Sequence, residues 1–121
     1  DANPLETFGY LIAQLNSRNL AYLHVNRPDW LGGSFEGYDA LLRALRDLYT
    51  GTLIIAGGQT AESGEQAVAE GLADLVAYGR PYIATPDLLA RFQAGAELNA
   101  LDGSTLYGGG AAGYTDYPAL N

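Results

Sequence analysis

The sequence lacks cysteine and has a single histidine, and both features narrow the chemistry that it can support. Without cysteine there is no disulfide, no thiolate metal site and no cysteine nucleophile. A serine–histidine–aspartate triad would depend entirely on His24, and no second metal-ligating residue lies at useful spacing from it. We therefore expect no metal site, and we interpret His24 as a structural residue in the core of a strand.

Basic residues are also scarce, because six Arg and Lys stand against 14 Asp and Glu, a formal net charge of −8. Binding to nucleic acid or to anionic membranes needs cations that neutralise phosphate, so we expect neither partner. No apolar run approaches the roughly 20 residues of a membrane span. The first ten residues have neither the basic nor the apolar segment of a secretory signal, and we expect a cytoplasmic protein.

Helical and strand patterns alternate along the 121 residues, which is the length of one small domain. The first helix is expected to begin after the cap at Asn3, with Pro4 at its first position, and to end near Arg18. Further elements are expected as strands over residues 20–25, 52–56 and 75–78 and as helices over residues 37–49, 61–70 and 86–94.

The last of these helices is expected to use Thr85 as its N-cap and Pro86 as its first residue, and to end at Gly95. Gly71 is the expected stop of the helix over residues 61–70. Residues 81–84 predict a short extra turn, and the chain from Ala96 onward is expected to be a mostly irregular tail rich in Gly and Tyr.

The three predicted strands are short and mostly apolar, which is typical of parallel strands buried on both faces. Their alternation with helices favours right-handed crossovers and one parallel sheet. Three such strands leave two open sheet edges with unpaired backbone groups. Either more chain supplies the neighbouring strands, or the segment is unstable alone.

Glycine follows two consecutive strands, as Gly57-Gly58 and as Gly79-Arg80. Ligands of parallel α/β folds bind at the carboxyl ends of the strands, where glycine lets the backbone approach them. Backbone N–H groups at a helix N-terminus favour anions, and an arginine adds a bidentate contact to phosphate oxygens. Either pair alone is more often a plain turn, but the two together indicate a phosphate site whose ligand this pattern leaves open.

Aromatic residues stand in two loop regions. Trp30 follows the first strand, where it lines a pocket or caps the rim of the fold. Tyr107 lies with Tyr114 and Tyr117 among glycines of the tail, which either folds over a ligand or packs against the rest of the domain.

Four stretches of the chain resemble the C-terminal third of the Old Yellow Enzyme family of ene-reductases, its bacterial branch above all: LAYLH, TLIIAGG, ADLVAYGRPYIATPDLLARFQAGAELN and STLYGGGAAGYTDYP. The resemblance runs from about Thr7 to Leu120. It implies an α/β fold, the C-terminal part of a (β/α)8 TIM barrel, with strands six to eight and their helices. Residues 1–121 would then be one segment of a single FMN-binding domain.

In this family NADPH reduces a bound FMN, which passes a hydride from N5 to the β-carbon of an activated alkene. By this resemblance, the backbone N–H groups of Gly57, Gly58 and Gly79 hold the FMN phosphate, and Arg80 contacts it with its guanidinium. Tyr107 corresponds to a tail tyrosine that lines the substrate pocket.

The resemblance also assigns Trp30 to a loop at the mouth of that pocket. The family's groups that bind the substrate carbonyl and donate the proton come earlier in the chain, so we expect no catalytic residue in this segment. We expect part of an NAD(P)H-using reductase of enones, maleimides and nitro compounds, inactive without an N-terminal barrel portion in the same protein or on a companion chain. The alternative is a non-catalytic half-barrel that binds a phosphate ligand or associates with itself.

Overall fold

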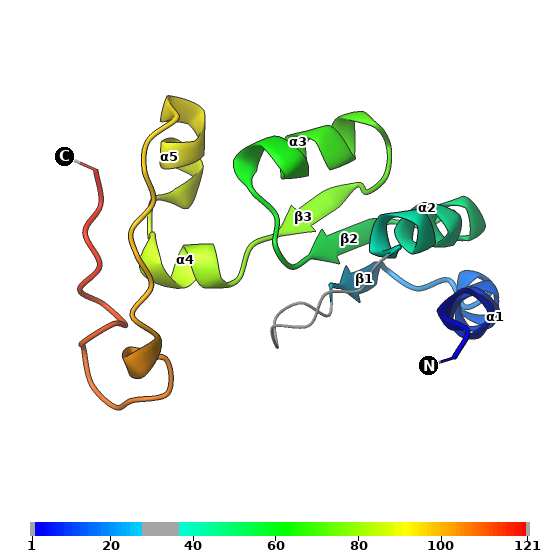
Figure 1. The fold of residues 1–121 in the computed structure, drawn as a ribbon, viewed down its shortest axis with the longest axis horizontal. Helices are drawn as coiled ribbons and strands as arrows, with labels where there is room; N and C mark the ends of the chain where they lie inside the picture. Colours follow the sequence, from blue (N-terminus) through cyan, green and yellow to red (C-terminus); the bar gives the residue numbers. More distant parts are fainter. Residues whose placement is uncertain (1, 28–36, 121) are drawn as a thin grey trace. The chain divides into compact units, whose positions relative to one another are not determined.

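The computed structural model describes residues 2–27 and 37–120. In chain order the elements are α1 (Pro4–Asn16), β1 (Leu23–Asn26), α2 (Tyr38–Leu48), β2 (Leu53–Ala56), α3 (Ala61–Ala69), β3 (Leu75–Ala77), α4 (Arg80–Ala84), α5 (Leu88–Ala94) and the 3-10 turn η2 (Gly103–Thr105) (Figure 1). The chain divides into two compact units, Asp1–Ala77 and Tyr78–Asn121, which are described separately. No helix among the described residues is long and apolar enough to cross a membrane.

The first unit is built on a parallel sheet with the strand order β1-β2-β3. Val25, Ile55 and Val76 stand beside one another in its register, and Ala56 pairs with Ala77 at the carboxyl end. The prediction of one parallel sheet is therefore confirmed. Within the described residues, β1 and β3 each have a neighbouring strand on one side only.

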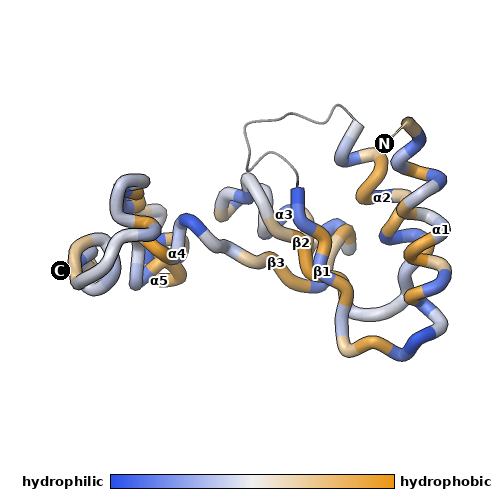
Figure 2. Tube along the Cα trace, turned by 90° about the horizontal axis from the view of Figure 1, so that it is seen from below, coloured by the Kyte–Doolittle hydropathy of each residue, from blue (hydrophilic) through white to orange (hydrophobic). Residues whose placement is uncertain are grey.

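The hydrophobic core of this unit lies on one face of the sheet. Leu53 and Ile55 of β2 are 0% and 1% exposed, and Leu23, Val25 and Val76 of the flanking strands pack against the same cluster. The helices contribute Ile12, Tyr38, Leu42, Leu45 and Ala67. Figure 2 shows hydrophobic residues along the three strands. Along α1, hydrophobic and polar residues alternate.

The described residues leave the opposite face of the sheet open. His24, Ile54 and Leu75 share one row of the register, none of them belongs to the core cluster, and Leu75 is 53% exposed. The prediction of strands buried on both faces is therefore wrong for this chain, and His24 is exposed. Helices on a single face are the arrangement of a (β/α)8 barrel, whereas a doubly wound sheet has helices on both faces.

Several predicted helix boundaries are confirmed. The side chain of Asn3 accepts a hydrogen bond from the backbone N–H of Glu6, with Pro4 at the start of α1. Gly71 follows α3 with φ of +70°, and Gly95 ends α5 with φ of +61°. Glycine adopts this left-handed conformation without the steric penalty of a Cβ atom.

The first strand begins three residues later than predicted, at Leu23. Its partner in the register is Leu53, the first residue of β2, so residues 20–22 have no strand beside them. Asn19 has φ of +51°, and this left-handed residue turns the chain between α1 and β1.

The predicted cap of the last helix is also wrong. Thr85 is the C-cap of α4 and not the N-cap of α5. Its buried hydroxyl accepts a hydrogen bond from the N–H of Asn99 instead. Helix α5 starts only at Leu88, after Asp87, whereas the predicted short turn over residues 81–84 is confirmed as α4.

Candidate functional site at the strand ends

The carboxyl ends of β2 and β3 lie side by side, because Ala56 and Ala77 are partners in a parallel register. Gly57 and Gly58 follow Ala56 directly, and Gly79 comes two residues after Ala77. Gly57 and Gly58 therefore leave the sheet at this edge, whereas Gly79 belongs to the second unit. This edge is where parallel α/β folds bind their ligands.

The backbone at Gly57 needs glycine for two reasons. Its φ of +97° lies in the region that other residues adopt at a steric cost. A Cβ atom built there would lie 2.8 Å from Cβ and 3.2 Å from the backbone nitrogen of Arg27. Arg27 is held in place by its N–H, which donates to the carbonyl of Ala56 over 2.9 Å, and its guanidinium lies 5.2 Å from the ring of Tyr38.

Helix α3, which follows this turn, is capped by its own residues. The side chain of Thr60 accepts from the N–H of Ser63, and the Ser63 hydroxyl accepts from the N–H of Thr60. Glu62 adds a negative charge to the first helical turn. The backbone N–H groups at the start of α3 are thus partly occupied by these internal hydrogen bonds. The Gly57-Gly58 turn before the helix is where the backbone has the space for a ligand to come close.

The second unit opens with the other predicted pair. Gly79 precedes α4 with φ of −88°, and a Cβ atom at this position would meet no atom within 4 Å. Arg80 is exposed, and its guanidinium makes no hydrogen bond or ion pair with another described residue. In contrast, three other arginines each bond a carboxylate: Arg43 to Glu70, Arg46 to Asp74 and Arg91 to Asp87, all at 2.9 Å. Arg80 is therefore a cation without a carboxylate partner among the described residues.

The other end of the sheet is braced by an acidic residue. One carboxylate oxygen of Asp74 accepts from the N–H of Leu53 at 2.7 Å and from the guanidinium of Arg46 at 2.9 Å. The N–H of Leu53 and the nearby guanidinium lower the pKa of Asp74. This brace ties the starts of β2 and β3 together, so it supports the fold at the end remote from the candidate site.

Of the two aromatic residues predicted to line a pocket, the structure describes one. Tyr107 follows η2 and is 99% exposed, and Tyr114 in the same tail is 82% exposed. These rings have almost no packing partner within their unit. Trp30 lies outside the described residues.

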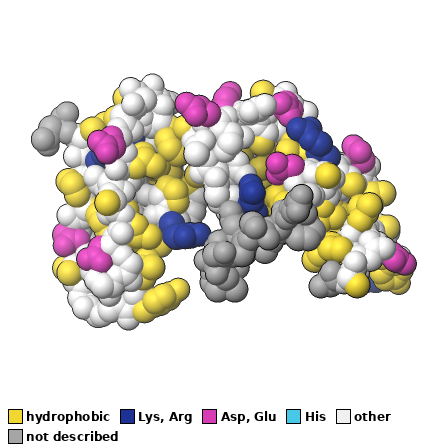
Figure 3. All heavy atoms as spheres, in the orientation of Figure 1, with side chains coloured by type: hydrophobic (Ala, Val, Ile, Leu, Met, Phe, Trp, Pro, Cys, Tyr) yellow, Lys and Arg dark blue, Asp and Glu magenta, His cyan; other side chains and the backbone are white. Residues whose placement is uncertain are grey.

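An apolar groove runs beside β1 in the first unit, with a volume of about 510 Å³. It lies between α1 and α2, and its lining includes Phe8, Leu11, Leu23, Val25 and Leu41. Large hydrophobic side chains also reach the surface elsewhere, as the yellow areas of Figure 3 show. A chain that folded alone would leave this surface in contact with water.

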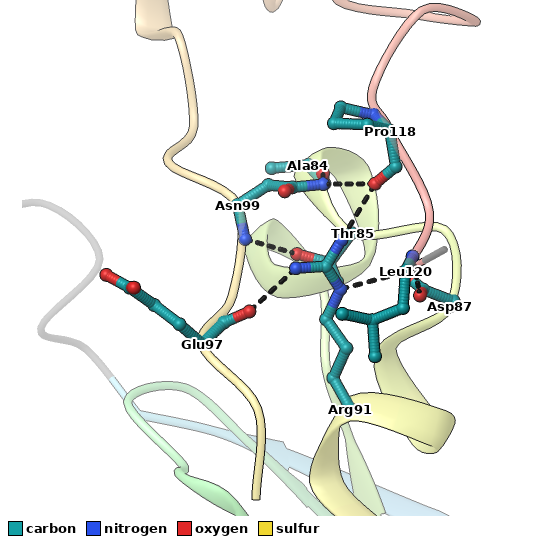
Figure 4. A network of polar contacts seen from close by, with 8 residues as sticks. All are labelled: Ala84, Thr85, Asp87, Arg91, Glu97, Asn99, Pro118 and Leu120. Carbon is teal, nitrogen blue, oxygen red and sulfur yellow. Dashed lines mark hydrogen bonds and ion pairs between the residues drawn. The ribbon is translucent and has the colours of Figure 1, made fainter. Parts of the chain in front are cut away.

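Sequence reasoning missed a buried polar network around Arg91 in the second unit (Figure 4). A signal for it exists in the sequence, since Asp87 and Arg91 stand four residues apart, the spacing of helical ion pairs. The remaining partners are backbone carbonyls and an asparagine far along the chain, which no local pattern indicates.

A family model described as NADH:flavin oxidoreductase / NADH oxidase matches residues 5–99. The chain belongs to the Old Yellow Enzyme family. It is 43% identical over 122 residues to 12-oxophytodienoate reductase 2 of Arabidopsis thaliana, covering 99% of this chain and 33% of that protein. It is 41% identical over 130 residues to putative 12-oxophytodienoate reductase 12 of Oryza sativa subsp. japonica, covering 100% of this chain and 32% of that protein.

Solved structures of this family share the fold. The structure of morphinone reductase in complex with tetrahydroNAD superposes with a TM-score of 0.85 and 44% identity, over 100% of this chain and 32% of that one. The predicted fold class, α/β with the strands and helices of a (β/α)8 barrel segment, is thereby confirmed. This Old Yellow Enzyme chain spans about a third of the length of the relatives that it matches.

Proposed function

We propose that this chain is part of an FMN-dependent ene-reductase that takes electrons from a reduced nicotinamide. Membership of the Old Yellow Enzyme family supports the flavin, and the likeness to a morphinone reductase complexed with tetrahydroNAD supports the nicotinamide. By their names, the relatives given above are reductases of 12-oxophytodienoate and of morphinone, which supports an activated alkene next to a carbonyl as the substrate class.

The register of β2 and β3 carries the proposal for the cofactor. It ends both strands at one sheet edge, directly before Gly57-Gly58 and shortly before Gly79-Arg80. The absence of side chains at the glycines lets backbone approach a phosphate group, and Arg80 has no competing carboxylate among the described residues. We assign these four residues to the FMN phosphate, because a guanidinium binds phosphate oxygens in bidentate fashion.

FMN, when bound, would accept a hydride from the nicotinamide and deliver it to the alkene. The residues of this chain serve binding and orientation. Arg80 and the glycine turns anchor the phosphate end of the cofactor, and the exposed ring of Tyr107 supplies an apolar surface with a polar tip for the substrate. We assign Trp30 to the same pocket from its loop position. None of the described residues is assigned a catalytic role.

The remaining barrel strands are proposed as the partner of this segment. The apolar groove beside β1, the free edges of the sheet and its open face are surfaces that further parallel strands would bury. The chain covers only about a third of its relatives, and a protein of their length has room for such strands. They lie in the same protein or on a companion chain.

Turnover tests the proposal directly. The protein that carries this chain is expected to be yellow and to oxidise NADPH, or NADH at a different rate, only when 2-cyclohexenone is present under anaerobic conditions. The isolated 121 residues are expected to show no such turnover. Enone reduction by the isolated segment would contradict its dependence on further barrel strands, and a colourless protein without enone turnover would contradict the function itself.

A second candidate function is a non-catalytic half-barrel that binds a phosphate ligand or pairs with its own copy. The open sheet face with exposed Leu75 and the groove beside β1 favour it, since a second copy would bury the same surfaces. Enone turnover by the protein that carries this chain distinguishes the two, and sedimentation of the isolated chain tests self-association. A stable dimer that binds FMN, together with no turnover by that protein, supports the half-barrel, whereas a ligand-free monomer contradicts its self-association.

A further inference from the structure

Arg91 in α5 is the one charged residue that is buried among those described, with 6% of its surface exposed. Its guanidinium donates three hydrogen bonds, to the carboxylate of Asp87 at 2.9 Å, the carbonyl of Glu97 at 2.7 Å and the carbonyl of Pro118 at 2.8 Å (Figure 4). These acceptors belong to three different segments of the second unit. A buried cation requires such compensation, so the side chain has few other arrangements.

A second set of bonds meets at the same point. The side-chain amide of Asn99 donates to the carbonyl of Ala84 at 2.8 Å and to that of Pro118 at 2.7 Å. The N–H of Asn99 donates to the hydroxyl of Thr85. The carbonyl of Pro118 thus accepts from both Arg91 and Asn99, and Figure 4 shows the two donors converging on it.

Asp87 completes the network on the tail side. One of its oxygens accepts from Arg91, and the other accepts from the N–H of Leu120 at 2.7 Å. The N–H of Leu120 and the adjacent guanidinium lower the pKa of Asp87. The chain is therefore fixed at residues 97–99 and again at 118–120, and the segment between them forms a closed loop.

The closed loop also has internal restraints. The N–H of Asp102 donates to the hydroxyl of Tyr117 at 3.0 Å, across the base of the loop. A Cβ atom on Gly113 would lie 1.9 Å from the hydroxyl of Thr105, so this turn packs against η2 only because it is glycine. At the outer end of the loop the ring of Tyr107 is almost fully exposed.

We propose that Arg91 is a positioning residue, which closes the tail segment between Asn99 and Pro118 into a preformed loop and so restricts the positions from which Tyr107 meets the substrate. The inference rests on the proposed pocket role of Tyr107, because a loop without that role would need Arg91 for stability alone. Preorganisation of a binding loop lowers the entropy lost when substrate binds.

Amide hydrogen exchange tests the closed loop without reference to activity. In Arg91→Lys the ammonium group cannot reach all three acceptors at once, so the amide of Leu120 is expected to exchange at least about tenfold faster than in the wild type. Arg43→Lys is the matched control, since Arg43 makes one exposed ion pair with Glu70. If Arg91→Lys is not obtained folded, Asp87→Asn weakens the same network, and exchange is then followed at the amide of Asn99, which bonds Thr85 and not Asp87. Unchanged exchange at Leu120 in Arg91→Lys, or at Asn99 in Asp87→Asn, overturns the proposal.

A double-mutant cycle on the holoenzyme tests the link to substrate. Arg91→Lys is expected to raise the KM for 2-cyclohexenone roughly tenfold with flavin content unchanged, and this effect is expected to disappear in a Tyr107→Ala background, because interacting positions are not additive. Equal effects in both backgrounds would reduce Arg91 to a structural role and overturn the proposal. If Tyr107→Ala alone leaves the KM unchanged, Tyr107 has no pocket role, and the proposed link between Arg91 and the substrate is wrong as well. The exchange result still decides whether Arg91 closes the loop.

Discussion

Replacement of Gly57 by alanine tests the packing of the strand-end turn. The new methyl group would meet two penalties, a backbone φ of +97° and a contact of 2.8 Å with Cβ of Arg27. The conformational penalty is about 1–2 kcal/mol. Relief of the overlap adds about 1–3 kcal/mol. The backbone of Arg27 has to shift, although its N–H is hydrogen-bonded to the carbonyl of Ala56. The free energy of unfolding is therefore expected to fall by about 2–5 kcal/mol.

Gly71→Ala is the matched control for this experiment. Gly71 also has positive φ, +70°, but a Cβ atom there would meet nothing within 4 Å. It carries the conformational penalty without the overlap, so the difference between the two variants isolates the contact with Arg27. Urea unfolding followed by far-ultraviolet circular dichroism measures both. Equal destabilisation of Gly57→Ala and Gly71→Ala would refute the close packing of the turn against Arg27.

Three further changes have defined outcomes. Asp74→Asn is expected to lower the free energy of unfolding by about 1 kcal/mol at pH 7, because a charge-assisted bond to the N–H of Leu53 is weakened. The pKa of Asp74 is lowered from 3.8 in the folded state, so its contribution to the free energy of unfolding is present above that pH and is lost as the pH falls through the folded pKa. Urea unfolding from pH 5 to 2 should therefore show a weaker pH dependence of the free energy of unfolding in the variant. An unchanged pH dependence would exclude this role. Gly113→Ala is expected to increase proteolysis of the tail, because its Cβ would overlap the side chain of Thr105, and wild-type resistance would contradict the packing. Tyr107→Ala is expected to leave the melting temperature within a degree or two, about the change of an exposed substitution, while the KM for an enone rises; a large fall in melting temperature would show that the ring is packed.

Local sequence signals predicted the first unit well. The cap at Asn3 and Pro4, the glycine stop at Gly71 and the order of helices and strands depend on neighbouring residues, and the structure contains them. The parallel sheet followed from the alternation of elements. These features do not need knowledge of distant contacts.

The errors arise where distant residues decide. Strand β1 starts at Leu23 because β2 begins at Leu53, its partner across the sheet. Thr85 fails as a helix cap because its hydroxyl is used by Asn99, 14 residues later in the chain. His24 was expected in the core, but it is exposed, and no core residue among those described lies in its row of the sheet.

For the candidate site, the sequence predicted which residues follow the strands, and the register shows that β2 and β3 end side by side at Ala56 and Ala77. The sequence holds a signal for the ion pair of Arg91, since Asp87 stands four residues before it. It could not show that Arg80 has no carboxylate partner among the described residues, because that depends on residues distant in the chain. The roles of Tyr107 and Trp30 stay predictions that depend on the family resemblance.

Comparison of FMN with riboflavin tests the phosphate site most directly, because the two flavins differ only in the phosphate group. Dissociation constants are measured by fluorescence titration of the deflavinated protein that carries this chain, in the wild type and in Arg80→Ala. We expect the variant to bind FMN about 10- to 150-fold more weakly, the loss of one charge-assisted contact, with riboflavin binding unchanged. An equal loss of affinity for both flavins, or no loss for FMN, would contradict a phosphate site at Arg80.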